Sequence, residues 1–162
     1  MATAKSEHKT TDLNVFEKLS KDHRKVESLF KKLLVTDDED TERESIFNDI
    51  YRELEAHTQA EEKLFYPRTE ESDMTHYLTL EAYEEHRLVK QLLDELKDAD
   101  KNTEEWCAKA EVLSELFKLH VREEEDEIFP KAKKVIMKDE SIDLAQEVEK
   151  EEESVKHSLE AA

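Results

Sequence analysis

Glycine is absent from this 162-residue chain, and proline occurs only twice. Tight β-hairpin turns depend on residues that tolerate positive φ, chiefly glycine, so a β-rich fold has almost no turn-forming residues here. Charged residues make up 43% of the chain, and its length suits one domain with a substantial core. The composition therefore predicts a single all-α domain.

Positive charge is also scarce. The chain has 25 Lys and Arg residues against 44 Asp and Glu residues, a formal net charge of −19. Such a surface repels phosphate backbones and anionic membranes, and the few basic residues form no stripe along the sequence. We expect neither nucleic acid nor a membrane as a partner, and the sequence indicates no particular protein partner.

Long apolar runs are missing as well. The longest uncharged run, Met74 to Leu80, has seven residues, whereas a membrane-spanning helix needs about 20. Residues 1–12 lack the apolar core of a secretory signal. The single cysteine, Cys107, cannot form an internal disulfide, and beside Trp106 it is interpreted as a packing or surface residue rather than a catalytic thiol. These features predict a cytoplasmic protein.

Four segments carry apolar residues at helical spacing. They predict helices over 13–35, 41–65, 75–97 and 103–128. Thr41 and Glu44 have the spacing of a capping box, Pro67 is expected to stop the second helix, and Thr103 is expected to cap the fourth. Because the connections are short, the four helices predict an antiparallel up-down-up-down bundle.

The remainder of the chain is highly charged. It includes a short fifth helix predicted from about Ser141, whose last residues are expected to fray. We therefore divide the chain into a bundle over residues 1–138 and a charged C-terminal helix or tail over residues 139–162.

The stretch HTQAEEKLFYP, from His57 to Pro67, has a second copy. It is HVREEEDEIFP, from His120 to Pro130, which begins 63 positions later. Upstream, DHRKVESLF around His23 is repeated as EHRLVKQLL around His86, again 63 positions later. The bundle is therefore a duplicated helix pair, and the residues that recur most consistently between the two copies are polar. The repeated set consists of His23, His57, Glu61, His86, His120 and Glu124.

Helical geometry directs each HxxxE pair to one side of its helix. At about 100° per residue, positions four apart differ by only about 40°, so both groups point into the core stripe. Glu62 and Glu125 are about 140° from their histidines. We expect them to face outward or to act as outer partners of the inner groups.

Buried carboxylates and imidazoles cost several kcal/mol each when unpaired, and no Lys or Arg lies on the inner stripes to neutralise them. Mutual hydrogen bonds would satisfy one pair but not six groups from four helices. Metal ions would satisfy them all, and imidazole with carboxylate suits iron, manganese or zinc. Four imidazoles and two bridging carboxylates are too many ligands for one ion but suit two, with about two positions left for water, dioxygen or peroxide.

On these residues the chain resembles the hemerythrin-like, or HHE, domains over residues 12–131, in the order H…HxxxE…H…HxxxE. The resemblance implies a non-haem di-iron centre with a bridging oxo or hydroxo group, although the same ligands would also hold manganese. It assigns the six groups of the repeat as iron ligands and makes Glu61 and Glu124 the bridging carboxylates.

The sequence departs from the oxygen-carrying hemerythrins at one point. Those proteins have a fifth histidine on the third helix, where this chain has Ala82 and Lys90 four positions either side of His86. The smaller ligand set is expected to leave one metal more open, which favours chemistry with oxygen, nitric oxide or peroxide over reversible oxygen carriage.

Three functions fit this interpretation, and the sequence leaves open whether the protein is an enzyme. The first is binding of dioxygen, or reaction with it, for sensing, storage or detoxification. The second is an enzyme that decomposes peroxide or reduces nitric oxide. The third is an interaction domain whose folding is controlled by iron.

The remaining candidate residues are interpreted more simply. Three histidines outside the repeat, His8, His76 and His157, are expected at the surface. Several aromatic residues are predicted near the metal centre, where they are expected to act chiefly as core: Tyr51, Phe65, Tyr83, Phe117 and Phe129. No residue stands out as a nucleophile, and no glycine-rich loop exists to bind a nucleotide.

Overall fold

The computed structural model describes residues 13–37 and 41–161. Within these ranges every regular element is a helix, which confirms the all-α prediction. In chain order the elements are α1 (Val15–Leu33), α2 (Glu42–Ala60), η1 (Glu61–Phe65), α3 (Tyr66–Glu70), α4 (His76–Asp98), α5 (Glu104–Glu123), η2 (Glu124–Ile128), α6 (Phe129–Ala132) and α7 (Lys138–Glu160). The elements η1 and η2 are single π-helical turns.

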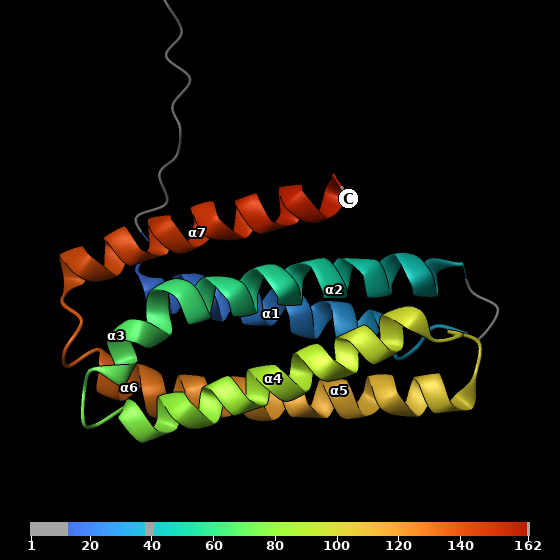
Figure 1. Ribbon diagram of the computed structural model, residues 1–162, viewed down its shortest axis with the longest axis horizontal. Helices are drawn as coiled ribbons and strands as arrows, with labels where there is room; N and C mark the ends of the chain where they lie inside the picture. Colours follow the sequence, from blue (N-terminus) through green and yellow to red (C-terminus); the bar gives the residue numbers. More distant parts are fainter. Residues whose placement is uncertain (1–12, 38–40, 162) are drawn as a thin grey trace, which may run out of the picture.

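The helices form an antiparallel bundle with a fifth helix on one side (Figure 1). The first pair consists of α1 and α2, and the second pair consists of α4 and α5; each pair is packed closely along its length. Helix α7 lies outside the bundle against α1 and α2. The predicted helix pairs are therefore also the packing units of the fold.

Helix α1 begins at a complete capping box. The side chain of Asn14 accepts a hydrogen bond from the backbone N–H of Glu17, and the Glu17 carboxylate accepts one from the backbone N–H of Asn14. The capping box predicted at Thr41 is not formed. Thr41 has helical φ and ψ, and an N-cap side chain needs extended backbone to reach back to the first turn. Thr103 has that extended backbone and accepts from the backbone N–H of Trp106, as predicted.

Pro67 does not end the second helix, contrary to the prediction. The chain passes from α2 through η1 into α3 and ends at Glu70. In η1 the hydrogen bonds lengthen by one residue, so that the N–H of Tyr66 bonds the carbonyl of Glu61. Pro67 then occupies the first turn of α3, where a missing N–H costs little. Pro130 follows η2 in the same way.

The core consists of two apolar clusters, with His23 in α1 between them. Leu19 belongs to the cluster around Phe16, Phe65 and Phe129, and Val26, one turn beyond His23, belongs to the cluster around Leu54 and Phe117. Both clusters are almost completely buried. The polar groups of the repeat therefore lie in the middle of the bundle.

Helix α7 is longer than the short helix predicted from Ser141. It packs its buried residues on α1 and α2, and they are Ser141, Leu144, Ala145, Val148, Glu152 and Val155. Ion pairs flank this contact, with Lys18 Nζ 2.6 Å from Glu152 and Lys63 Nζ 2.9 Å from Glu151. The division of the chain at residue 138 stays a prediction, since α7 lies directly on the bundle.

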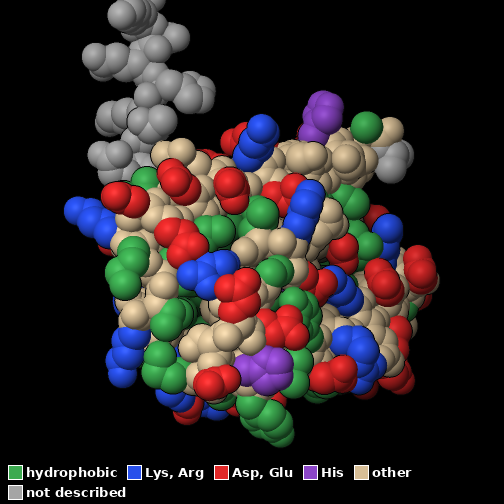
Figure 2. All heavy atoms as spheres, turned by 60° about the vertical axis from the view of Figure 1, so that its left-hand side comes forward, with side chains coloured by type: hydrophobic (Ala, Val, Ile, Leu, Met, Phe, Trp, Pro, Cys, Tyr) green, Lys and Arg blue, Asp and Glu red, His purple; other side chains and the backbone are tan. Residues whose placement is uncertain are grey.

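Acidic side chains cover much of the face seen in Figure 2, with Lys and Arg side chains between them. Within the described ranges, no helix is both long enough and apolar enough to cross a membrane.

Candidate metal centre

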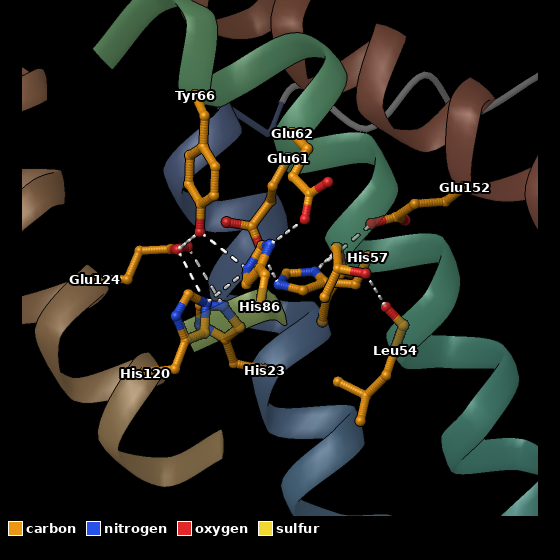
Figure 3. Close-up of polar contacts among 12 residues, drawn as sticks. His23, Leu54, His57, Glu61, Glu62, Tyr66, His86, His120, Glu124 and Glu152 are labelled. Atoms are coloured by element: carbon orange, nitrogen blue, oxygen red, sulfur yellow. Dashed lines mark hydrogen bonds and ion pairs between the residues drawn. The ribbon is translucent and has the colours of Figure 1, made fainter. Parts of the chain in front are cut away.

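The two HxxxE pairs occupy corresponding positions in the two helix pairs. His57 lies in the last turn of α2 and His120 in the last turn of α5, and each is followed by a glutamate that opens a π-turn. His23 and His86 come from the middle of α1 and α4. Figure 3 shows these side chains converging between the four helices.

The structure brings all six predicted ligands together. Five of them each offer an atom within 4.8 Å of the others, and they are His23, His57, Glu61, His120 and Glu124. The sixth, His86, places Nε2 3.3 Å from Nε2 of His120 and 4.0 Å from Oε1 of Glu61. None of the six side chains is more than 2% exposed. We call this group the His/Glu cluster.

The imidazoles form two pairs, one in each half of the bundle. The ring centroids of His23 and His57 are 4.9 Å apart, and those of His86 and His120 are 4.7 Å apart. Glu124 reaches both pairs, with Oε1 3.5 Å from His23 Nε2 and Oε2 3.2 Å from His120 Nε2. Glu61 contacts the Nε2 atom of His57. Two nitrogen pairs separated by two carboxylates match the arrangement of a two-metal site.

Each cluster histidine faces an outer carboxylate through its other nitrogen. The Nδ1 atom of His23 lies 2.8 Å from Glu125, that of His86 lies 3.0 Å from Glu62, and that of His120 lies 3.1 Å from Glu85. The Nδ1 atom of His57 lies 3.5 Å from Asp22. A carboxylate that accepts a hydrogen bond from Nδ1–H leaves the Nε2 lone pair free for a metal. The outer role expected for Glu62 and Glu125 is therefore the one they have.

These outer carboxylates belong to the duplication too. Glu62 and Glu125 are 63 positions apart, and so are Asp22 and Glu85. The repeat contains Asp22 and Glu85 as the acids immediately before His23 and His86. That signal is present in the sequence, but Asp22 and Glu85 neighbour a core position instead of occupying one, so the pattern of inner stripes does not include them.

Several buried polar atoms of the cluster lack hydrogen-bond partners within the described part of the chain. They include Nε2 of His23 and His57, both carboxylate oxygens of Glu61 and Oε1 of Glu124. A buried polar atom without a partner costs about 1–3 kcal/mol, and more when it is charged. A cation between these atoms would satisfy them together, so the residues present fit a bound metal.

The electrostatics of the cluster differ from one group to the next. Burial, reinforced by the nearby Glu124, raises the pKa of Glu61 to about 7. Burial lowers the pKa of His86 to about 4. Burial would also lower the pKa of His120, but the Glu124 carboxylate outweighs it and raises that pKa to about 10. Protons and cations therefore compete for the same nitrogen and oxygen atoms.

Tyr66 is the functional residue that the sequence did not predict. Its hydroxyl donates to Oε2 of Glu124 at 2.7 Å and lies 3.1 Å from Nε2 of His86. In a regular α-helix Tyr66 would be rotated about 140° from Glu61. The wider π-turn η1 places five residues in one turn and brings Tyr66 back to the side of Glu61, as π-turns often do at functional sites.

A second contribution that the sequence did not predict comes from α7. Glu152 is buried, and its Oε1 lies 3.8 Å from Nδ1 of His57 (Figure 3). With Asp22 and His57 it forms a second group of possible metal-ligating atoms, but Lys18 Nζ lies 2.6 Å from both carboxylates. The lysine ammonium already provides a cation there, so we interpret this group as support for His57.

The predicted aromatic residues have different surroundings. The ring of Phe129 stacks on His23 at 6.3 Å, and that of Phe117 lies 6.0 Å from His23. Tyr83 and Phe65 contact Tyr66 rather than a cluster histidine. Tyr51 packs against Phe47 and donates to Asp94. Phenylalanine rings therefore exclude water from the cluster on the His23 side.

Residues outside the cluster behave largely as expected. His76 and His157 are exposed, and His8 lies outside the described residues. Cys107 is half-buried. Ala82 is buried, and Lys90 Nζ donates to Glu62 at 3.0 Å. The metal-ligating group found within the described ranges contains no fifth histidine.

Comparisons with known proteins identify the same region. Residues 14–132 match the hemerythrin HHE cation binding domain. A solved structure of a hemerythrin HHE cation binding domain-containing protein from Mycobacterium kansasii superimposes with a TM-score of 0.80 and 24% identity, over 90% of this chain and 89% of that one. At this identity the likeness shows a shared fold.

Two curated relatives are longer than this chain. An uncharacterised hemerythrin-like protein of Schizosaccharomyces pombe is 30% identical over 137 residues, which cover 80% of this chain and 64% of that protein. A protein of Nostoc named DNA nickase is 34% identical over 122 residues, which cover 73% of this chain and 33% of that protein.

Proposed function

The chain belongs to the hemerythrin HHE cation-binding family, and we propose that it holds two iron ions and binds dioxygen or reacts with it. The observation that carries the proposal is the set of buried Nε2 and carboxylate atoms that face one another without hydrogen-bond partners in the described residues. Oxygen or redox sensing, oxygen storage and detoxification all fit such a centre.

The proposed ligands divide between two metal positions. His23 and His57 would hold one ion, His86 and His120 the other, and Glu61 and Glu124 would bridge them. The donor set consists of nitrogen and oxygen without thiolate, which suits iron and equally manganese. Iron, when bound, supplies exchangeable electrons and open coordination positions at which dioxygen, nitric oxide or peroxide can react.

The chain's own residues prepare the centre for that chemistry. Glu62, Glu85 and Glu125 accept from Nδ1–H and aim the imidazoles inward. Phe117 and Phe129 keep water from the His23 side, which strengthens electrostatic interactions within. The Tyr66 hydroxyl donates a hydrogen bond to the Glu124 carboxylate, and burial raises the pKa of that hydroxyl well above its usual value. The hydroxyl is therefore a stable hydrogen-bond donor at neutral pH.

An enzyme that decomposes peroxide or reduces nitric oxide is the second candidate, and Tyr66 is the observation that favours it. Both reactions involve proton transfer, since reduction of nitric oxide consumes protons and decomposition of peroxide moves them from one oxygen to another. The Tyr66 hydroxyl carries a proton directly beside the cluster. Turnover by the iron-loaded protein, abolished by Glu61→Ala, would support the enzyme. Stoichiometric binding without turnover would favour the oxygen-binding protein.

We do not extend the name of the Nostoc relative to this chain. Only 33% of that protein is matched, and a net charge of −19 opposes approach to a phosphate backbone. The proposal also includes a cytoplasmic location, because the single cysteine suits a reducing compartment.

The test is the metal content of the purified, tag-free protein, recorded with its optical spectrum before and after air reaches the reduced form. We expect two irons per chain and a new oxygen-dependent absorption in the near ultraviolet. His57→Ala should lose iron, whereas His157→Ala, which changes an exposed histidine, should keep it. Failure to bind iron after anaerobic loading would overturn the proposal, and bound iron without an oxygen-dependent change would overturn its oxygen chemistry.

A further inference from the structure

The face of the bundle that α7 covers has a counterpart on the other helix pair. On α1, the residues at the edge of α7 include Lys18, Lys21, Asp22 and Lys25. The positions 63 residues later are Glu81, Glu84, Glu85 and Leu88 of α4. All four line a shallow depression of about 400 Å³ on α4 and α5. The duplication therefore produces two equivalent faces, of which α7 occupies one.

The uncovered counterpart carries exposed apolar side chains. Tyr77, Leu80, Leu88 and Leu119 line it and are 71%, 40%, 41% and 37% exposed. On the covered face, the counterpart of Leu119 is Ala56, which is completely buried. Four exposed large apolar side chains gathered in one depression are unusual for a surface with this much charge.

The two faces carry opposite charge. Beneath α7, lysines on α1 and η1 meet an acidic helix, as in the pairs Lys18–Glu152 and Lys63–Glu151. The depression on α4 and α5 is lined instead by acidic residues together with the apolar ones, and none of its lining residues is Lys or Arg. The acidic lining residues are Glu81, Glu84, Glu85 and Glu123. A helix that fits here must therefore be basic where α7 is acidic.

We propose that this α4/α5 face, lined by the residues just named, binds a basic amphipathic helix of a partner protein. The apolar side chains of the partner helix lie on Leu80, Leu88 and Leu119, and its Lys and Arg side chains pair with the acidic lining residues. A helix bound in a groove uses apolar anchor residues at helical spacing. The packing of α7 on α1 and α2 shows that the equivalent face of the bundle binds a helix.

A second copy of the chain fits the face poorly. The exposed helix of another copy, α7, is itself acidic and would meet Glu81 and Glu84 with like charge. The net charge of −19 adds a general repulsion between copies. Charge complementarity therefore selects a basic partner over self-association.

The probe is a fluorescein-labelled synthetic helix with leucines at helical spacing on one side and lysines on its flanks, titrated with the full-length protein and followed by anisotropy. One control peptide has glutamate in place of lysine. A second has the same composition as the probe in scrambled order, which removes the apolar side but keeps the charge. We expect saturable one-to-one binding of the probe alone.

Matched variants of the protein locate the binding. Leu88→Ser with Leu119→Ser should weaken probe binding about tenfold or more, whereas Val35→Ser, at an apolar residue 80% exposed elsewhere, should not. Glu81→Lys with Glu84→Lys places lysine at both positions, as α1 has at Lys18 and Lys21. That variant should lose the basic probe and bind the acidic peptide.

Three results would overturn the proposal. Equal binding of the scrambled peptide would reduce the interaction to charge attraction, and unchanged binding by the leucine variant would place it elsewhere. A dimer in sedimentation that the leucine variant dissociates would show that a second copy covers the face. Helical circular dichroism and iron content, unchanged in all variants, establish that each still folds.

Discussion

The α1/α2 half and the α4/α5 half of this bundle each carry five corresponding polar groups at an offset of 63 positions, yet the surroundings of these groups differ at two places. Tyr66 of the first half has Phe129 as its counterpart, so a hydroxyl reaches the His86–His120 pair while a phenyl ring stacks on His23. In addition, α7 covers only the α1/α2 half, where it brings Glu152 to His57.

The duplication preserves the His/Glu cluster and its outer carboxylates but not the residues that border them. The inner histidines and glutamates and their outer carboxylates are kept, because each is needed to satisfy the others in a buried site. The differences fall on residues that border the cluster. The two proposed metal positions are therefore alike in their direct ligands and unlike in the groups around them.

The largest expected effect comes from removing a shared carboxylate. Glu61→Ala or Glu124→Ala should weaken iron binding at both positions, by more than the about 10–100-fold typical of losing an outer partner. The reason is that each of these carboxylates lies between the two imidazole pairs, Glu124 between His23 and His120 and Glu61 between His57 and His86. The number of irons bound per chain is measured after dialysis against a chelator. Both irons should be lost together, and retention of one iron per chain would contradict a shared bridge.

Removing an outer carboxylate should have a smaller effect that differs between the halves. Glu85→Gln should weaken iron binding about 10–100-fold, because Glu85 is the carboxylate at 3.1 Å from His120 Nδ1. Glu152→Gln should cost less, since His57 also faces Asp22. Chelator competition would compare the two variants, and a larger loss for Glu152→Gln would reverse the ranking.

Loss of the tyrosine hydroxyl tests the other difference between the halves. Tyr66→Phe removes the hydrogen bond to Glu124 and should lower the unfolding free energy of the metal-free protein by about 1–2 kcal/mol. Urea denaturation measures this change. Phe129→Tyr is the matched control at the counterpart position, and an unchanged midpoint for Tyr66→Phe would mean that the hydroxyl does not stabilise the Glu124 carboxylate.

The smallest effect is a pH dependence of iron loading. The Glu124 carboxylate outweighs burial and raises the pKa of His120 to about 10, so this imidazole is protonated at pH 7. Iron needs the neutral imidazole, so loading at pH 7 should release protons, and iron affinity should fall as the pH is lowered. His86, with a pKa of about 4, should release none. A pH-stat titration during anaerobic loading measures the release, and its absence would contradict the protonated state.

Much of the site followed from the sequence because it rests on spacing. The offset of 63 and the four-residue separation within each HxxxE predicted six groups on one inner surface, and the structure brings all six together. The bundle followed from four apolar stripes of helical period, and a short fifth helix was predicted from about Ser141. Periodicity is a local property of the chain, so it can be counted before the fold is known.

The features that the sequence did not reveal depend on departures from regular spacing or on distant contacts. Pro67 was expected to end a helix, but the π-turn η1 carries the chain past it and turns Tyr66 toward the cluster. Counting at about 100° per residue cannot anticipate that inserted residue. Glu152 likewise reaches His57 from almost a hundred positions away, through packing of α7 on α1 and α2.

The amino-acid sequence by itself thus determined the helical bundle, its duplication and the six polar groups at its centre, because helical period and residue type are enough to direct side chains inward. Only the tertiary structure decided which half receives the tyrosine hydroxyl, which half α7 covers and which face stays open. Those outcomes depend on how the helices pack against one another, and packing is settled by shape and charge across the whole molecule.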